Sequence, residues 1–250
     1  MKKYKVSLIS YLNSRPFLYG LENSPIAEEI DLKLDIPART AEKLISNRID
    51  IGLVPVGSLL DLPDYQVVGE FCISAEGPVR TVILAGAVPL EKMETILMDY
   101  QSRSSVLLTK ILAHYFWKKE FKWKKTCAHF ENESIAGTTG GIVIGDRVFS
   151  VEKRYPYIYD LSSEWNRFTG LPFVFAVWVT RKDLPSGFLE RFNRAVESGV
   201  LRVPEVERIE QPHFPGVDVY EYFTRNINYR FDARKKEGMS LFLELGRKIR

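Results

Sequence analysis

The sequence predicts an α/β protein of two lobes, with a ligand cleft between them and two strands that cross from one lobe to the other. Strand and helix patterns alternate over residues 6–54 and again over 95–144, as in mainly parallel sheets flanked by helices. Two long apolar runs, at 79–85 and 173–180, are typical of strands that leave the first lobe and return to it. A length of 250 residues is sufficient for two lobes. Such clefts close on small ligands by hinge motion.

The first lobe opens with a predicted βαβαβ unit. A short apolar run at 6–10 and the alternating apolar residues of 30–36 predict two strands. A short helix at 16–21 lies between them, and apolar residues at helical spacing predict a second helix over 41–49. The apolar run 51–54 then predicts a buried strand. We therefore expect ligands to bind at the carboxyl ends of these strands.

The second lobe repeats the pattern between the two crossing runs. Residues 95–98 and 142–144 predict strands, and 107–116 predicts a helix with one strongly apolar face. The unit between them places another turn at a strand end, where a second set of polar groups faces the cleft.

The chain is then expected to return to the first lobe. Apolar residues at helical spacing within 188–196 and 239–245 predict helices that pack back on it. We accordingly assign residues 1–86 and 178–250 to a discontinuous first lobe and residues 87–177 to the second.

Composition and charge exclude several classes of protein. The chain has 35 Lys and Arg against 32 Asp and Glu, which gives a net charge of only +3. The densest basic run, 118–125, also contains Glu120 and follows an apolar helix, so a solvated helix end or hairpin explains it better than a nucleic-acid surface. Cys72 and Cys127 have neither a disulfide framework nor zinc-ligand spacing around them.

The apolar pattern also predicts where the protein resides. The N-terminal apolar stretch 6–12 is short, contains two serines and is followed by no small-residue cleavage site, so no export is expected. No window approaches 18 uninterrupted apolar residues, so no membrane span is expected either. We predict a cytoplasmic protein with reduced thiols.

The strongest candidate for a ligand site is the stretch 99–106, DYQSRSSV, between a strand and an amphipathic helix. It places Ser102, Ser104 and Ser105 at a helix N-terminus, where unpaired backbone N–H groups and the positive end of the helix dipole favour a carboxylate or phosphate. Helix capping alone is the commoner explanation of Ser and Asp at this position.

The turn 11–16, YLNSRP, occupies the equivalent place in the first lobe. Asn13 can donate and accept hydrogen bonds, so it could hold a hydroxyl or carboxylate across the cleft, and Ser14 lies beside it. Capping of the following helix is again the alternative.

Three further loops supply the remaining candidates for binding or catalysis. The loop after the third strand contains Ser58, and the loop before the first crossing strand contains Ser74 and Gly77. Asp146 follows the last strand of the second lobe and could take part in proton transfer, although a cap or an ion pair is commoner for such a residue. The Gly and Pro residues of these loops could also serve only to form turns.

Other reaction classes find no support. His114, His129 and His213 lie outside the strand-end loops, which disfavours a histidine base. The sequence has no phosphate-binding or dinucleotide-binding glycine motif and no nucleophile elbow. We expect no metal and no cofactor.

Taken together, the motifs resemble those of a known family, the chorismate dehydratases of the futalosine route to menaquinone. The resemblance rests on the ordered set YLNSRP at 11–16, GLVPVGSL at 52–59, DYQSRSSVLL at 99–108, IGDRV at 144–148, TGLPFVFAVW at 169–178 and YFTRNINYRFDARKKEGMSLF at 222–242. It covers almost the whole chain. It implies a periplasmic-binding-protein type II fold that has become a cytoplasmic enzyme, which agrees with the two predicted crossings.

The resemblance also implies a lyase reaction and roles for the candidate residues. Chorismate would lose water to give 3-[(1-carboxyvinyl)oxy]benzoate. The three serines would hold one carboxylate, and Asn13, which matches the family's cleft asparagine, would orient the reacting face or the departing hydroxyl. The base would be the substrate's own enolpyruvyl carboxylate, Asp146 or Glu76, and the sequence does not choose among them.

Two alternatives stay open at this point. One is the 1,4-dihydroxy-6-naphthoate synthase of the same pathway, which shares the fold. The other is a non-catalytic binding protein for an anionic small metabolite, which an export signal would have favoured. No nucleic-acid or membrane partner is expected, and the protein is expected to be a monomer or a homodimer.

Overall fold

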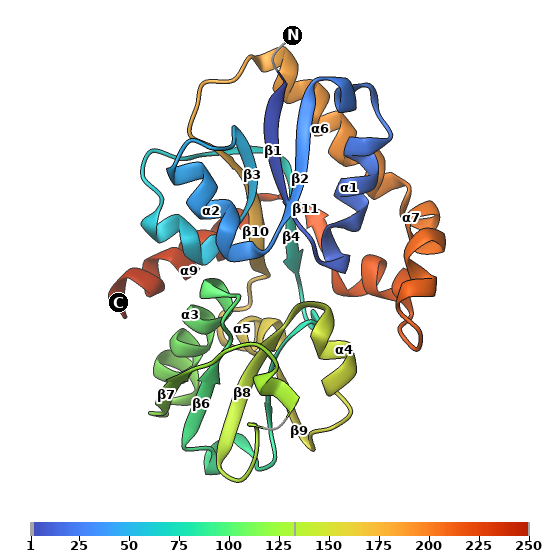
Figure 1. Ribbon diagram of the computed structural model, residues 1–250. Coiled ribbons are helices and arrows are strands. Elements are labelled where there is room, and N and C mark those ends of the chain that lie inside the picture. Colours follow the sequence, from blue (N-terminus) through green and yellow to red (C-terminus); the bar gives the residue numbers. More distant parts are fainter. Residues whose placement is uncertain (1–2, 133, 250) are drawn as a thin grey trace.

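A computed structural model describes residues 3–132 and 134–249 and contains two β-sheets, each covered by helices (Figure 1). The first sheet has six strands in the order β11-β4-β10-β3-β1-β2, and the second has five in the order β7-β6-β8-β5-β9. The first comprises β1 (Tyr4–Ile9), β2 (Ile30–Asp35), β3 (Ile51–Pro55), β4 (Gln66–Ala75), β10 (Phe173–Thr180) and β11 (Asn228–Arg230). The second comprises β5 (Val82–Gly86), β6 (Thr95–Met98), β7 (Lys122–Lys125), β8 (Thr139–Ile144) and β9 (Tyr157–Asp160).

The predicted βαβαβ unit forms the parallel part of the first sheet. β1 pairs in parallel with β2 on one side and with β3 on the other, and the crossovers contain α1 (Arg15–Glu22) and α2 (Pro37–Ile45). The helix expected over 41–49 begins earlier, because Pro37 occupies its first turn, where the missing N–H costs nothing. β10 and β11 are antiparallel to their neighbours, so the sheet is mixed rather than mainly parallel.

The second sheet is mixed as well. β6 and β8 are parallel neighbours, whereas β5 is antiparallel to both β8 and β9. The helix after β6 is α3 (Arg103–Ile111), which continues as a π-helical turn, Leu112–Trp117. The remaining short helices of this lobe are α4 (Val148–Val151) and α5 (Leu161–Thr169).

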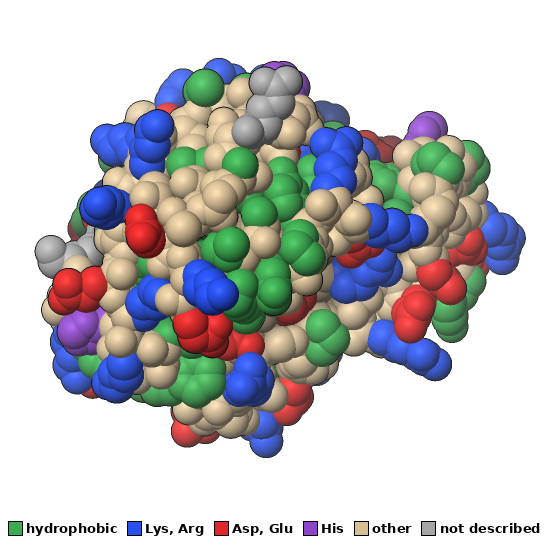
Figure 2. Space-filling view, turned by 90° about the horizontal axis from the view of Figure 1, so that it is seen from below, with side chains coloured by type: hydrophobic (Ala, Val, Ile, Leu, Met, Phe, Trp, Pro, Cys, Tyr) green, Lys and Arg blue, Asp and Glu red, His purple; other side chains and the backbone are tan. Residues whose placement is uncertain are grey.

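The basic run at 118–125 ends the helix and then forms an edge strand. Lys118 has φ of 53°, which stops the helix, and β7 pairs in parallel with β6, so the run does not form a hairpin. Figure 2 shows Lys and Arg side chains interspersed with Asp and Glu on the face of the molecule seen from the second lobe. On that face there is no broad field of one sign, which agrees with the prediction against a nucleic-acid surface.

Strand pairing places both boundaries between the lobes earlier in the chain than the predicted boundaries at residues 86 and 178. β5 pairs only within the second sheet, and β10 pairs along its length with β3 and β4 of the first. The apolar run at 79–85 is interrupted because Arg80 adopts φ of 63°, and the backbone N–H of this residue donates to Asp160 Oδ2 at 2.7 Å. The crossings therefore lie at 76–81 and 170–172.

The C-terminal third returns to the first lobe as predicted, and its last helix also touches the second. It contains α6 (Ser186–Leu201), α7 (Val203–Glu210), α8 (Val219–Glu221), a π-helical turn (Tyr222–Asn226) and α9 (Ala233–Lys248). α9 packs on β10, on the 3₁₀ turn Val56–Asp61 and on α3. The last helix therefore bridges the lobes beside the cleft.

Backbone contact between α1 and α6 fixes the outer layer of the first lobe. A Cβ added at Gly199 would lie 1.8 Å from the carbonyl oxygen of Pro16, and one added at Gly20 would lie 2.0 Å from that of Ala195. The two helices can approach this closely only because both positions are glycine. Since α1 follows the turn that carries Asn13, this packing also positions the cleft residue.

We predict that Gly199→Ala lowers the free energy of unfolding by about 2 kcal/mol or more, because the methyl group would force the helices apart. Gly187→Ala is the matched control, since its Cβ would meet nothing closer than Arg191 Nη1 at 3.5 Å. It should leave stability unchanged or raise it by up to about 1 kcal/mol through helix propensity. Chemical denaturation of both variants measures the difference, and equal stability would contradict the packing argument.

Candidate functional site

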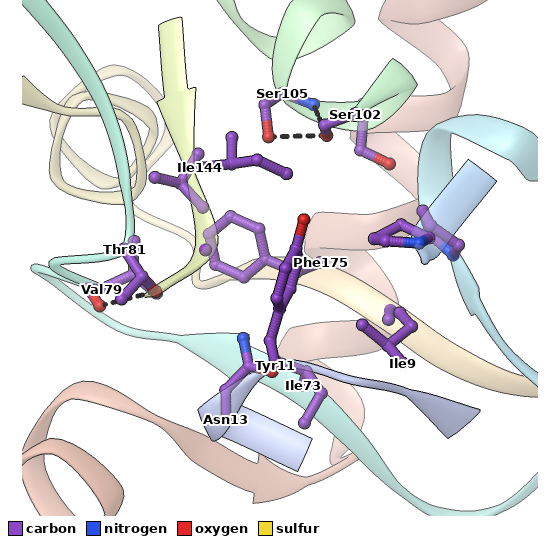
Figure 3. Close-up of a pocket in the computed structure, with 16 residues that line it drawn as sticks. Ile9, Tyr11, Asn13, Ile73, Val79, Thr81, Ser102, Ser105, Ile144 and Phe175 are labelled. Carbon is purple, nitrogen blue, oxygen red and sulfur yellow. Dashed lines mark hydrogen bonds between the residues drawn. The ribbon is translucent and has the colours of Figure 1, made fainter. Parts of the chain in front are cut away.

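A pocket lies between the two lobes, with a cavity volume of about 50 Å³ (Figure 3). A cavity of this size holds a few water molecules, so a larger ligand needs the lobes to move apart. Its lining is mostly apolar, with hydroxyl and amide groups in between, and none of the lining residues that the structure describes carries a charge. They are Ile9, Tyr11, Asn13, Pro37, Pro55, Ile73, Val79, Thr81, Val82, Ser102, Ser104, Ser105, Ile144, Gly145, Phe175 and Ala176.

The start of α3 forms one wall of the pocket, where the sequence predicted an anion site. Ser102 is the N-cap: its Oγ accepts from the Ser105 backbone N–H at 3.0 Å and donates to Ser105 Oγ at 2.9 Å. Ser102, Ser104 and Ser105 all line the pocket. Ser102 therefore caps the helix and also lines the cavity with the other two serines, and the binding of an anion there stays a prediction.

Tyr11 reaches across the pocket from the first lobe. Figure 3 shows its hydroxyl pointing toward the side on which Ser102 and Ser105 lie. The hydroxyl donates to Gln101 Oε1 of the second lobe, and burial raises the pKa of the phenol, so it stays a neutral donor. Gly145 packs on the ring, and a Cβ at this position would lie 2.8 Å from it.

Asn13, Thr81 and Tyr222 form a polar cluster at another side of the pocket. Thr81 Oγ1 and the Tyr222 hydroxyl are 2.8 Å apart, and the Asn13 amide acts to lower the pKa of Tyr222. Tyr222 is fully buried, and burial raises its pKa well above the ordinary value. Asn13 and Thr81 line the pocket, whereas Tyr222 lies behind them.

Two hydrogen bonds join the lobes directly beside the pocket. The Gly57 backbone N–H of the first lobe donates to Ser104 Oγ at 2.8 Å. The Leu12 backbone N–H of the first lobe donates to both carboxylate oxygens of Asp146, at 3.1 and 3.2 Å. A Cβ at Gly57 would lie 2.8 Å from Ser104 Cα, so glycine is needed for this approach. The cleft is closed in this structure, and a ligand needs the lobes to separate before it can enter.

Asp146 is turned away from the pocket, toward the start of the first-lobe helix. It does not line the pocket. Tyr11 is the N-cap residue of the 3₁₀ turn Leu12–Ser14 but makes no capping hydrogen bond with its side chain, and the Asp146 carboxylate accepts from the Leu12 N–H in its place. Burial raises its pKa from 3.8 to about 6; the hydrogen bond from Leu12 and the charge of Arg15 oppose this rise, and Glu210 adds to it. A buried carboxylate whose pKa is raised in this way is typical of functional sites.

A buried ion-pair network holds the loop that presents the serines. Arg147 contacts Asp99 at 2.6 Å and Glu131 at 3.2 Å, and Asp99 also accepts from the Gln101 backbone N–H at 2.8 Å. The Arg147 guanidinium lies over the Tyr100 ring, 5.1 Å from its centroid. This network links the loop after β8 to the loop after β6.

Besides Asp146, five of the predicted residues lie outside the pocket. Glu76 is exposed and pairs with Arg234 at 2.8 Å, which leaves it remote from a bound ligand. The Ser14 hydroxyl donates to backbone carbonyls of Ile9 and Tyr11, and Ser74 donates to the Asn228 carbonyl at 2.6 Å, so both have structural partners. Ser58 is buried in the turn after β3, and Gly77 has φ of 101° in an open turn.

Sequence reasoning did not single out Tyr11, Thr81, Tyr222 or Phe175 as functional. Tyr11 follows the first strand, and Thr81 lies at the first crossing between the lobes. These positions in the chain were the only signal that the sequence offered for the two residues. Tyr222 comes to the pocket through its contact with Thr81, which lies 141 positions earlier in the chain, and no local pattern carries such a contact.

No group of three or more His, Cys, Asp or Glu residues within 3–132 and 134–249 is arranged to hold a metal ion. Over the same residues, no helix combines the length and the apolar character that crossing a membrane requires.

Comparison with known proteins places this chain in a family. Residues 4–248 match a protein family described as menaquinone biosynthesis. The chain belongs to this family. The chorismate dehydratase of Thermus thermophilus is 25% identical over 270 aligned residues, which cover 98% of this chain and 95% of that protein. The family resemblance predicted from the ordered motifs is thereby confirmed.

Solved structures confirm the predicted fold class of this menaquinone biosynthesis protein. A protein from Archaeoglobus fulgidus superposes with a TM-score of 0.79 at 13% identity, covering 99% of this chain and 97% of its own. A Candida albicans gene product, described as having the generic periplasmic-binding-protein fold, superposes with a TM-score of 0.69 at 14% identity, covering 99% and 91%. The chain therefore has the two-lobed periplasmic-binding-protein fold.

We predict that Asp146→Asn changes how stability depends on pH. The pKa of Asp146 in the folded protein lies above its value in the unfolded chain, so the folded state binds more protons between pH 4 and 6. The stability that protonated Asp146 contributes is therefore full below this window and is lost as pH rises through it. The wild type should lose up to about 3 kcal/mol relative to Asp146→Asn between these pH values. Denaturation of both proteins at several pH values measures it; parallel curves would contradict the raised pKa.

Proposed function

We propose that this protein is a chorismate dehydratase, which converts chorismate to 3-[(1-carboxyvinyl)oxy]benzoate and water. The observation that carries the proposal is the pocket itself, in which the start of α3 faces Asn13 across an enclosed, mostly apolar space. A small anion with an apolar ring fits such a lining. The full-length similarity to the Thermus thermophilus chorismate dehydratase supports the same substrate.

The reaction needs little acid–base machinery. The C3 proton of chorismate is activated through the ring double bond by the ring carboxylate, so its removal gives a delocalised anion. That anion expels the C4 hydroxyl as the ring becomes aromatic, and the departing hydroxide takes up a proton to leave as water. The protein's contribution is then to position the substrate and to stabilise the anion.

The start of α3 is the proposed carboxylate site. Ser102, Ser104 and Ser105 present hydroxyl groups there, and the first-turn N–H groups add the positive end of the helix dipole. As negative charge spreads from the ring into its carboxylate, neutral donors at this end stabilise the developing anion without a buried countercharge.

Asn13 is the proposed partner of the departing hydroxyl. It lines the pocket on the first-lobe side, at the carboxyl end of β1, and its amide can both donate and accept. Of the three candidate bases, Glu76 is exposed and Asp146 faces Leu12 rather than the pocket. We therefore favour the substrate's own enolpyruvyl carboxylate as the base.

The decisive test is to incubate the purified protein with chorismate and analyse the mixture by mass spectrometry. A product lighter than chorismate by one water, together with an aromatic absorbance, is expected. Asn13→Ala should lower turnover by about 100-fold, because the reacting group loses its orientation. Near-normal turnover by Asn13→Ala would contradict the assignment of this residue.

The same experiment separates the proposal from its alternatives. Unchanged chorismate together with consumption of cyclic dehypoxanthine futalosine would identify the 1,4-dihydroxy-6-naphthoate synthase reaction instead. Binding of chorismate without conversion, measured by calorimetry, would identify a binding protein. Glu244→Gln, an exposed carboxylate on α9 that pairs with Lys248, is the control variant and should leave turnover unchanged.

A further inference from the structure

An open groove adjoins the closed pocket, between α2 of the first lobe and the residues of the second lobe that lead into α3. Its volume is about 470 Å³, whereas the closed cavity has about 50 Å³. The groove is lined by Glu42, Met98, Asp99, Tyr100, Gln101, Ser102, Arg103, Val106, Lys125 and Thr126.

The groove and the cavity share a wall. Ser102 lines both of them. Helix α2 also takes part in both, because Pro37 lines the cavity and Glu42 lines the groove. The two spaces therefore adjoin each other along α2 and the start of α3, where the lobes meet.

A hydrogen bond between the lobes closes the boundary between the two spaces. Tyr11 of the first lobe lines the cavity, whereas Gln101 of the second lobe lines the groove. The Tyr11 hydroxyl donates to Gln101 Oε1, so the bond runs from the cavity side to the groove side. In Figure 3 this hydroxyl points toward the side on which Ser102 lies, the residue that both spaces share.

Each partner of this bond is held by its own lobe. The Gln101 side-chain nitrogen donates to the Tyr100 hydroxyl at 2.8 Å, and the Gln101 backbone N–H donates to Asp99 Oδ1 at 2.8 Å. In the first lobe, the Tyr11 carbonyl accepts from the Ser14 hydroxyl at 2.8 Å. When the lobes separate, Tyr11 and Gln101 therefore move apart with their lobes and the bond between them breaks.

We propose that the groove is the entrance of the pocket and that the hydrogen bond between Tyr11 and Gln101 is its gate. A ligand enters the groove, passes Ser102 when the lobes separate, and is enclosed when the bond forms again. Gly145 allows the Tyr11 ring to reach its closed position, because a Cβ there would lie 2.8 Å from the ring. The nature of the ligand, a small anion with an apolar ring, rests on the proposed function, whereas the gate does not.

Amide hydrogen exchange of the unliganded protein tests the gate. The Leu12 and Gly57 backbone N–H groups donate to oxygens of the second lobe, so they become free to exchange when the lobes separate. Tyr11→Phe keeps the ring but removes the donor, and it should speed exchange at both amides by about 3- to 10-fold. Gln101→Met should act in the same direction, and the double variant should exchange no faster than the faster single variant, because one bond is lost in each.

Tyr159→Phe is the matched control for the gate. The Tyr159 hydroxyl accepts from the Leu90 backbone N–H at 2.8 Å, so this variant also removes one tyrosine hydrogen bond, but within the second lobe. Exchange at Leu12 and Gly57 should stay within about 2-fold of wild type. Unchanged exchange in Tyr11→Phe, or an equal increase in Tyr159→Phe, would overturn the gate.

Alkylation of a cysteine inside the pocket tests the entrance. Ser105→Cys, in a Cys127→Ser background, places a thiol in the cavity wall, and Cys72 is the other thiol, buried in β4. Iodoacetate is the probe, because it is a small anion and needs no turnover. Peptide mass spectrometry measures its rate of reaction at position 105.

Bulk placed in the groove should slow this alkylation. Lys125→Trp and Glu42→Trp each add an indole to the groove lining, one from each lobe, and should lower the rate by about 10-fold or more. Lys124→Trp is the matched control, because neighbouring residues of β7 point to opposite faces of the sheet, and it should stay within about 2-fold.

Equal alkylation rates in the three tryptophan variants would overturn the entrance. Neither measurement uses chorismate, so the proposed function can fail separately. If the protein leaves chorismate unchanged while the exchange and alkylation results are as expected, the proposed function fails and the gated entrance stands.

Discussion

The site depends on two pairs of parallel strands whose carboxyl ends face each other across the cleft. Leu12 and Gly57 follow β1 and β3 in the first lobe, and Ser104 and Asp146 follow β6 and β8 in the second. The loops after the first pair offer backbone N–H groups and those after the second offer oxygen acceptors, and these hydrogen bonds join the lobes beside the one from Tyr11 to Gln101. Because parallel strands place their carboxyl ends at one sheet edge, this meeting follows from topology.

The pocket is lined by neutral groups, and the charges stand one layer behind them. Arg147, Asp99 and Glu131 satisfy one another within the second lobe, and their role is to hold the serine loop rather than to contact a ligand. In the proposed site, a bound anion is held by hydroxyls, N–H groups and the dipole of α3. This arrangement avoids an ion pair with the substrate, and it leaves negative charge free to move from the substrate ring into its carboxylate as the proposed reaction proceeds.

The cluster of Asn13, Thr81 and Tyr222 connects this chemistry to the fold. Its members come from the first strand end, the crossing segment and the C-terminal return, so the cluster forms only when the chain has completed both crossings. The packing of α1 on α6 supports it from outside, because α1 follows directly on the turn that carries Asn13.

The sequence predicted the parts of this arrangement that depend on local pattern. β6 and β10 were predicted with the observed bounds, because both are apolar runs between clear turns. Ser102, Ser104 and Asn13 were found because capping residues after a strand mark a helix start. Glu76 and Ser74 were indistinguishable from them in the sequence, since their partners Arg234 and Asn228 lie more than 150 residues away. The mixed order of the first sheet likewise depends on β10 inserting between β3 and β4, which strand patterns do not encode.

The most direct test of the central claim is a crystal structure of the Asn13→Ala variant with chorismate bound. The account predicts closed lobes, with the ring carboxylate within hydrogen-bonding distance of the serine hydroxyls and the first-turn N–H groups of α3, and with the C4 hydroxyl directed at the space left by the Asn13 side chain. A carboxylate bound elsewhere, on an arginine or outside the cleft, would contradict the claim that facing strand ends form the site.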